Sequence, residues 1–125
     1  MIGHKTLTQE ESENSVGGSL VGYVSATREE IESVFGQATY TDLSLDEKVS
    51  IEWVVQFENG IIARIYDWKR YEEGTPLMNE LYEWHIGARE EAAVPFVAKA
   101  VQKDVTGFDA GNPPTFRRTK FKVSS

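Results

Sequence analysis

The chain has no cysteine among its 125 residues, and its only histidines are His4 and His85. The missing thiols exclude disulfides, thiolate zinc sites, iron–sulfur clusters and a cysteine nucleophile. Two histidines also exclude a metal site built from several histidines of one chain. The sequence has no P-loop, no Gly-x-Ser-x-Gly and no His-x-x-x-His pattern. We therefore predict a protein without a metal, without a cofactor and without catalytic residues.

Long hydrophobic runs are missing as well. No apolar stretch approaches the roughly 20 residues that a membrane-spanning helix needs, and the first residues lack the apolar stretch of a secretory signal. Apolar residues nevertheless make up 40% of the chain, which argues against global disorder. A chain of 125 residues is long enough for one domain and too short for two. We expect one soluble, intracellular domain without membrane contact.

Positive charge is scarce except at the C-terminal end. The formal net charge is −7, whereas residues 106–125 carry four basic residues and one acidic residue. We expect no binding to duplex DNA, because neutralising its phosphates needs a basic field. An acidic surface can instead face a basic protein, and a small nucleotide can still bind in a local basic pocket. The acidity can also serve solubility alone.

The composition divides the chain into three parts. Residues 1–18 are polar, acidic and glycine-containing, and we predict a flexible acidic leader there. Residues 19–105 form the predicted single α+β domain. Residues 106–125 begin with glycine and proline residues and continue as a basic C-terminal arm. This arm is either an added strand or a segment that docks on another subunit.

Two helices are predicted, at about 28–35 and about 88–104. Thr27 and Glu30 have the spacing of a capping box, and Gly36 supplies a left-handed helix end. The second helix has an apolar stripe that includes Val97 and Val101. Pro95 costs a helical hydrogen bond unless it lies in the first turn, so this helix either begins near Val94 or is kinked.

Residues 50–68 read as a hairpin around a Glu-Asn-Gly turn. A three-residue loop with Gly60 in the left-handed position pairs Phe57 with Ile61. This register gives an entirely apolar face that ends at Asp67, and because a one-residue slip would exchange the faces, we expect it to win. The opposite face carries Val54, Ile62, Arg64, Tyr66 and Trp68. A helix or the tail of the same chain, a second subunit or a ligand is expected to cover it.

Residues 81–86 form a third predicted strand, which places Trp84 and His85 on opposite sides. Together these elements predict an α+β fold: an antiparallel sheet of three to five strands centred on the 50–68 hairpin, two helices and a C-terminal arm. Uncovered aromatic surface on the second sheet face predicts a homo-oligomer.

Aromatic and basic residues gather at the ends of the predicted strands. Aromatic planes stack bases, and Arg and Lys side chains meet phosphates. This combination makes a nucleotide site one interpretation, and a tryptophan-rich core with surface cations the other. The candidate ligand-binding residues are Arg64, Tyr66, Trp68, Lys69, Trp84, His85, Arg89, Arg117 and Arg118.

Two further readings use other side chains. His85 alternates with Glu83, and a histidine–carboxylate pair can do acid–base chemistry near neutral pH; a structural histidine is the alternative. The acidic residues can imitate a phosphate backbone toward a basic nuclease, or they are simply solvated. These acidic residues are Glu10, Glu11, Glu13, Asp42, Asp46 and Glu47.

The order of motifs resembles a group of small, mostly uncharacterised bacteriophage accessory proteins. The shared pattern is a tryptophan strand (residues 52–58), an Asn-Gly turn (59–60), a Tyr-x-Trp-Lys segment (66–69) and Trp-His-Ile-Gly (84–87). It covers about two thirds of the chain (residues 23–101), which has Ala88 where a second glycine is expected. The resemblance implies a phage protein in the host bacterial cytoplasm, and many such proteins block host defence.

The sequence thus favours a non-enzymatic phage protein that sequesters a small anionic nucleotide immune signal. The first alternative is an acidic protein–protein inhibitor of a host defence protein or nuclease, similar to anti-CRISPR proteins. The second alternative is a small hydrolase that uses His85 and Glu83.

Overall fold

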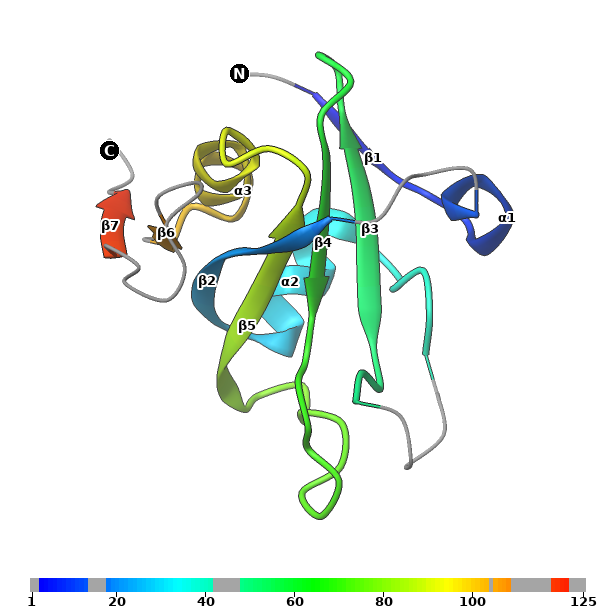
Figure 1. Cartoon of the computed structure of the whole chain (residues 1–125). Coiled ribbons are helices and arrows are strands. Elements are labelled where there is room, and N and C mark those ends of the chain that lie inside the picture. Colours follow the sequence, from blue (N-terminus) through cyan, green and yellow to red (C-terminus); the bar gives the residue numbers. More distant parts are fainter. Residues whose placement is uncertain (1–2, 14–17, 42–47, 104, 109–117, 122–125) are drawn as a thin grey trace.

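The computed structural model describes residues 3–13, 18–41, 48–103, 105–108 and 118–121 (Figure 1). The elements follow in the order β1 (His4–Thr6), α1 (Gln9–Ser12), β2 (Ser19–Thr27), α2 (Arg28–Phe35), β3 (Glu52–Phe57), β4 (Ile62–Tyr66), β5 (Leu81–Ala88), α3 (Ala93–Val101), β6 (Val105–Phe108) and β7 (Arg118–Phe121).

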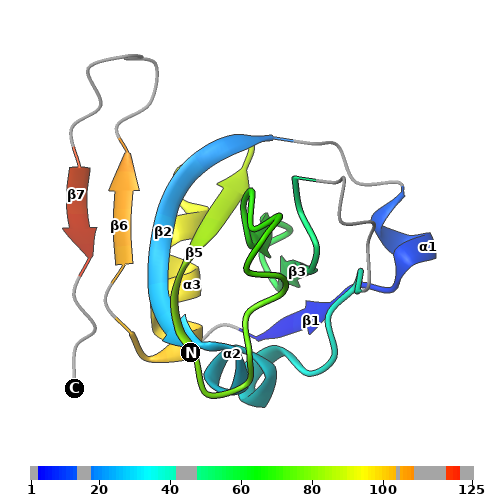
Figure 2. The same ribbon diagram turned by 90° about the horizontal axis from the view of Figure 1, so that it is seen from below.

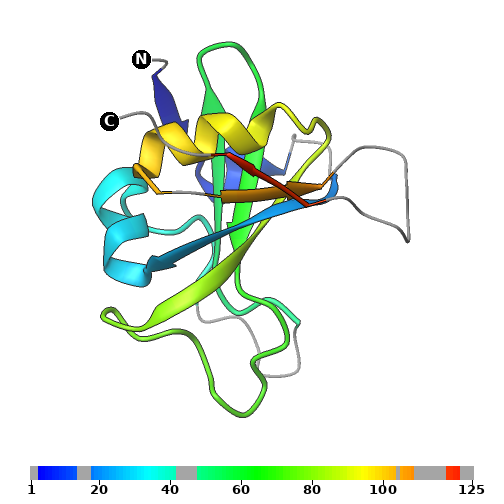
Figure 3. The same ribbon diagram turned by 90° about the vertical axis from the view of Figure 1, so that its left-hand side faces the viewer.

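These strands form one antiparallel sheet in the order β1-β3-β4-β5-β2-β6-β7. Helices α2 and α3 pack on one face, the core face (Figure 3), and β2 curves strongly along its length (Figure 2). The predicted α+β class is therefore confirmed. The sheet has seven strands rather than three to five, because β1 extends one edge and β6 and β7 extend the other.

The hairpin has the predicted register. The amide of Phe57 donates to the Ile61 carbonyl with an N–O distance of 2.8 Å, and Val55 lies opposite Ala63. Gly60 has a φ of 88°, which glycine adopts without strain. The side chains of the core face from Ile51 to Ile65 are then buried, except for the partly buried Ile61 at the turn, and they form a cluster with residues of both helices.

Helix α2 begins and ends where the sequence predicts. The Thr27 hydroxyl accepts from the Glu30 amide, and the Glu30 carboxylate accepts from the Thr27 amide. Helix α3 is shorter than predicted and begins at Ala93, so Pro95 lies in its first turn. Residues 88–92 are not helical, because β5 continues through Gly87 to Ala88 along its pairing with β2.

The described residues of the predicted leader form secondary structure. Residues 4–6 pair with β3 as an edge strand, and Leu7 is buried and donates its amide to the Val54 carbonyl. A capping box from Thr8 to Glu11 begins α1, which lies beyond the β1 edge (Figure 1). The N-terminal segment therefore pairs along the outer edge of β3 as far as Val54. The sequence left a helix or the tail of the same chain, a second subunit or a ligand as the cover of the sheet face to which Val54 belongs.

The C-terminal arm supplies an added strand. Residues 118–121 pair antiparallel with β6, which agrees with the first of the two readings of this arm. Residues 109–117 and 122–125 lie outside the described residues. Within the described part of the chain, no helix is long and apolar enough to cross a membrane.

Replacing Thr27 by alanine removes the hydroxyl that caps α2. We expect a loss of about 1 kcal/mol in the free energy of unfolding, measured by urea denaturation. Ser33→Ala in the same helix is the control, because its exposed hydroxyl bonds only to the Glu30 carbonyl and its loss should matter little. Equal stability of the two variants would contradict the capping role.

Candidate functional site

Four rings meet on the sheet face opposite the helices, and we call Tyr23, Tyr66, Trp68 and His85 the stacking cluster. The His85 ring is central: its centroid lies 4.9 Å from that of Tyr23, 5.4 Å from Tyr66 and 5.9 Å from Trp68. Strand register explains this, because both tyrosines lie opposite His85 on neighbouring strands. Paired residues on one face of antiparallel strands lie close enough for their side chains to touch.

A glycine lets Tyr66 lie against β5. A Cβ on Gly87 would lie 3.1 Å from Cε1 of Tyr66, so any larger residue would push the ring away. Burial of the phenol, followed by the charge of Glu52 and the nearby Tyr23, raises the pKa of Tyr66 to about 12. The hydroxyl therefore stays protonated at neutral pH and can donate a hydrogen bond.

His85 is half-buried in this cluster. Burial lowers the pKa of its imidazole, against the opposing charges of Glu83 and Asp67, so the ring is neutral at pH 7. Its Nδ1 atom is buried and has no hydrogen-bond partner. Among the described residues, no hydrogen bond joins His85 to the exposed Glu83. The pairing expected for acid–base chemistry is therefore not formed here.

Trp68 is the exposed member of the cluster, with 38% of its surface accessible. Its amide donates to the Tyr82 hydroxyl at 3.0 Å. Two ammonium groups flank its ring: Nζ of Lys48 lies 5.8 Å and Nζ of Lys69 lies 5.7 Å from the centroid. The next residue, Lys69, has a φ of 51° and donates its amide to the Lys48 carbonyl at 2.7 Å.

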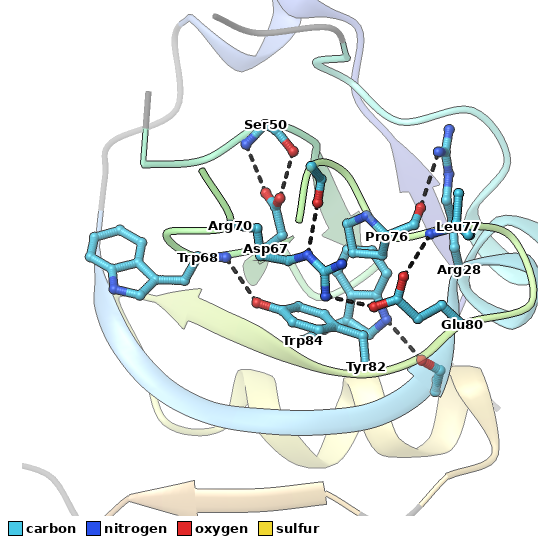
Figure 4. A network of polar contacts seen from close by, with 12 residues as sticks. Arg28, Ser50, Asp67, Trp68, Arg70, Pro76, Leu77, Glu80, Tyr82 and Trp84 are labelled. Atoms are coloured by element: carbon cyan, nitrogen blue, oxygen red, sulfur yellow. Dashed lines mark hydrogen bonds and ion pairs between the residues drawn. The ribbon is translucent and has the colours of Figure 1, made fainter. Parts of the chain in front are cut away.

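The carboxylate of Asp67 fixes the chain immediately before Trp68 (Figure 4). Asp67 is fully buried, and it accepts from the Ser50 amide at 2.7 Å, the Ser50 hydroxyl at 2.5 Å and the Ile51 amide at 3.1 Å. A buried carboxylate is tolerated only when it is hydrogen-bonded in this way. The start of β3 and the end of β4 are thereby held together.

The guanidinium group of Arg70 holds the loop between β4 and β5 in place. Arg70 donates to the Gly74 carbonyl at 2.8 Å and to the Glu80 carboxylate at 2.6 Å, and its guanidinium lies 5.0 Å from the Tyr82 ring centroid (Figure 4). Arg70 thus has a structural role: it holds the loop that carries Trp68 and packs on Tyr82 of β5, whose hydroxyl accepts from the Trp68 amide.

Arg64 lies on the same face as Tyr66 and forms an ion pair with Glu52 at 3.0 Å. Burial raises the pKa of the Glu52 carboxyl, although the charge of Arg64 and its hydrogen bond act in the opposite direction. Arg64 and Arg89 also line a hollow of about 100 Å³ beside the hairpin turn. We call this the arginine hollow.

Six of the predicted site residues lie on the face opposite the helices or in the adjoining hollow, whereas Trp84 does not belong to the site. The six are Arg64, Tyr66, Trp68, Lys69, His85 and Arg89. Trp84 points into the core, where its indole donates to the Ala26 carbonyl at 3.0 Å and packs on Trp53 at 5.3 Å. Its ring cannot stack on a ligand at the cluster, because side chains alternate along β5 and Trp84 points to the other face of the sheet from His85. Arg117 and the side chain of Arg118 lie outside the described residues.

Sequence reasoning missed Tyr23 and Lys48. Tyr23 joins the cluster because β2 pairs with β5, a long-range pairing that no local pattern announces. Lys48 comes close to Trp68 through the backbone bond to Lys69, which also has no signal in the sequence. The described residues contain no group of three His, Asp or Glu side chains that could hold a metal.

The acidic run near the N-terminus is partly engaged. Glu11 accepts from Lys5 at 2.5 Å and from the Thr8 amide, and these bonds lower the pKa of its carboxyl to about 2. Glu11 therefore serves the α1 cap. Asp42, Asp46 and Glu47 lie outside the described residues.

The neutral state of His85 has a consequence for stability. Its pKa is lowered in the folded chain, while an unfolded histidine titrates near 6.5. The unfolded state thus binds the proton first, and stability should fall as the pH drops below about 7. His85→Gln should flatten this slope between pH 7.5 and 5.5 in urea titrations. Glu52 contributes equally to the pH dependence of the unaltered protein and of His85→Gln. Equal slopes of stability against pH in the two proteins would therefore contradict the neutral state assigned to His85.

The chain matches no family model. It likewise matches no curated protein and no solved structure. The function is therefore argued from the stacking cluster and the charged groups around it.

Proposed function

We propose that this protein binds and sequesters a small anionic nucleotide, without transforming it, on the stacking cluster. The observation that carries the proposal is the exposed Trp68 ring, which has the ammonium groups of Lys48 and Lys69 close to it and the rings of His85 and Tyr66 beside it. An aromatic plane contributes about 1–3 kcal/mol per stacked base. Ammonium groups at the same position supply the complementary charge for a phosphate.

The state of His85 supports the non-enzymatic part of this proposal. Its imidazole is neutral, its Nδ1 has no partner and its ring is packed between other rings. A general base needs hydrogen-bond reach to the proton that it removes. His85 serves instead as one wall of a stacking surface.

The biological setting rests on the sequence resemblance to bacteriophage accessory proteins. We propose an anti-defence role in the host bacterial cytoplasm, in which the bound nucleotide is an immune signal. The proposal includes a homo-oligomer, since a second subunit would cover apolar surface that one chain exposes. Besides Trp68, which the proposal assigns to the ligand, the exposed large apolar side chains are Tyr71, Leu77, Met78 and Leu81.

The same exposed side chains favour a second candidate, an inhibitor that binds a host defence protein. Leu77 and Leu81 are 66% and 69% exposed, and acidic residues surround them in the sequence. Apolar patches with a polar rim are typical of protein interfaces. This candidate predicts that activity depends on Leu77 and Leu81 and not on Trp68.

Replacing Trp68 by alanine tests the nucleotide proposal. We expect the affinity for the bound member of a panel of cyclic nucleotides and ADP-ribose derivatives to fall about 10- to 100-fold, measured by calorimetry. Tyr71→Ala is the matched control, because it removes an exposed ring of the same loop that makes no contact with His85. Equal affinities of the two variants, or no binding of any panel member to the unaltered protein, would overturn the proposal.

A further inference from the structure

The arginine hollow lies next to the stacking cluster on the same sheet face. Its charged members are Arg64, Arg89 and Glu90, and its other lining residues are Gly18, Gly60, Ile62 and Ala88. Arg64 and Tyr66 are two residues apart on β4 and therefore point to the same face, with their Cα atoms about 6.8 Å apart along the strand. The hollow is thus one step along β4 from the rings.

The size of the hollow limits what it can hold. Its volume is about 100 Å³, whereas pockets that enclose a whole small ligand have about 300–1,000 Å³. One tetrahedral anionic group is therefore a better fit than a base or a sugar. Glu52 pairs with Arg64, so the two guanidinium groups and the carboxylates of Glu52 and Glu90 balance in charge. The case for an anion therefore rests on the charge-assisted N–H donors that the two guanidinium groups place around the hollow.

The walls of the hollow are held by the backbone. A Cβ on Gly18 would lie 2.3 Å from the Ala88 carbonyl carbon and 2.6 Å from the Arg89 amide nitrogen, so the chain packs backbone to backbone there. Gly87, which lies opposite Arg64, presents no side chain between the hollow and Tyr66. The Arg64 guanidinium is oriented by its ion pair with Glu52.

We infer that the arginine hollow is a phosphate subsite, which Arg64 and Arg89 provide for a phosphoryl group at some distance from the stacked base. The inference rests on the proposed function for the identity of the whole ligand, but the subsite itself binds phosphate without a base. This inference gives the cations two roles. Lys48 and Lys69 lie at the rings of the stacking cluster, and Arg64 and Arg89 bind the phosphoryl group in the hollow.

Calorimetric titration with inorganic pyrophosphate, which can place one of its two phosphoryl groups in the hollow, tests the subsite on the full chain. We expect Arg89→Gln to weaken pyrophosphate binding about tenfold or more, because one charge-assisted hydrogen bond is lost. We expect Glu90→Gln to strengthen it, because a repelling carboxylate is removed. Lys99→Gln on α3 is the control, since it removes the same charge from an exposed residue outside the hollow and should leave binding unchanged.

Arg64 is tested by lysine, which keeps a charge beside Glu52 but loses the planar fork; Arg64→Lys should weaken pyrophosphate binding as well. No pyrophosphate binding by the unaltered protein, or equal binding by Arg89→Gln, Glu90→Gln and Lys99→Gln, would overturn the subsite. Fluorescence quenching of Trp68 by adenosine separates the two proposals. Quenching without pyrophosphate binding removes the subsite alone, and pyrophosphate binding with no quenching supports the subsite and counts against the stacking site.

Discussion

The hydrogen bonds of the buried Asp67 carboxylate are the constraint on which the stacking cluster, on the sheet face opposite the helices, depends. They join Ser50 and Ile51, which immediately precede β3, to Asp67, which immediately follows β4. The apolar core face of the hairpin ends at this residue, and Trp68 follows it directly. Because the carboxylate is fully buried, any shift of β3 against β4 would leave a charge without donors, at a cost of several kcal/mol. The anchor therefore fixes both the register and the position of the exposed ring.

The register in turn gives the sheet two chemically different faces. Trp53 and Trp84 pack edge to face among apolar side chains, whereas the neighbouring positions Tyr66 and His85 build the stacking cluster. Alternation with a period of two makes these assignments mutually exclusive. The same residue types thus serve stability on one side of the sheet and present rings and cations on the other.

The sequence predicts the parts of the fold that local chemistry determines. The capping box at Thr27, the turn at Gly60 and the start of α3 just before Pro95 follow from short-range sterics and hydrogen bonding. The edge strand β1 and the place of Tyr23 follow from pairings between distant segments, which no short pattern encodes. Aromatic and basic residues at the strand ends place Trp84 among the candidate site residues, whereas its position on β5 turns its ring into the core.

The account has one central claim: the stacking cluster holds an intact small nucleotide. Native mass spectrometry of the protein after incubation with the nucleotide panel tests it most directly, followed by heating and analysis of the released compound. The account predicts a fixed ratio of ligand to subunit and release of the unaltered nucleotide. Release of a changed compound, or spectra that show only the ligand-free protein with every panel member, would contradict it.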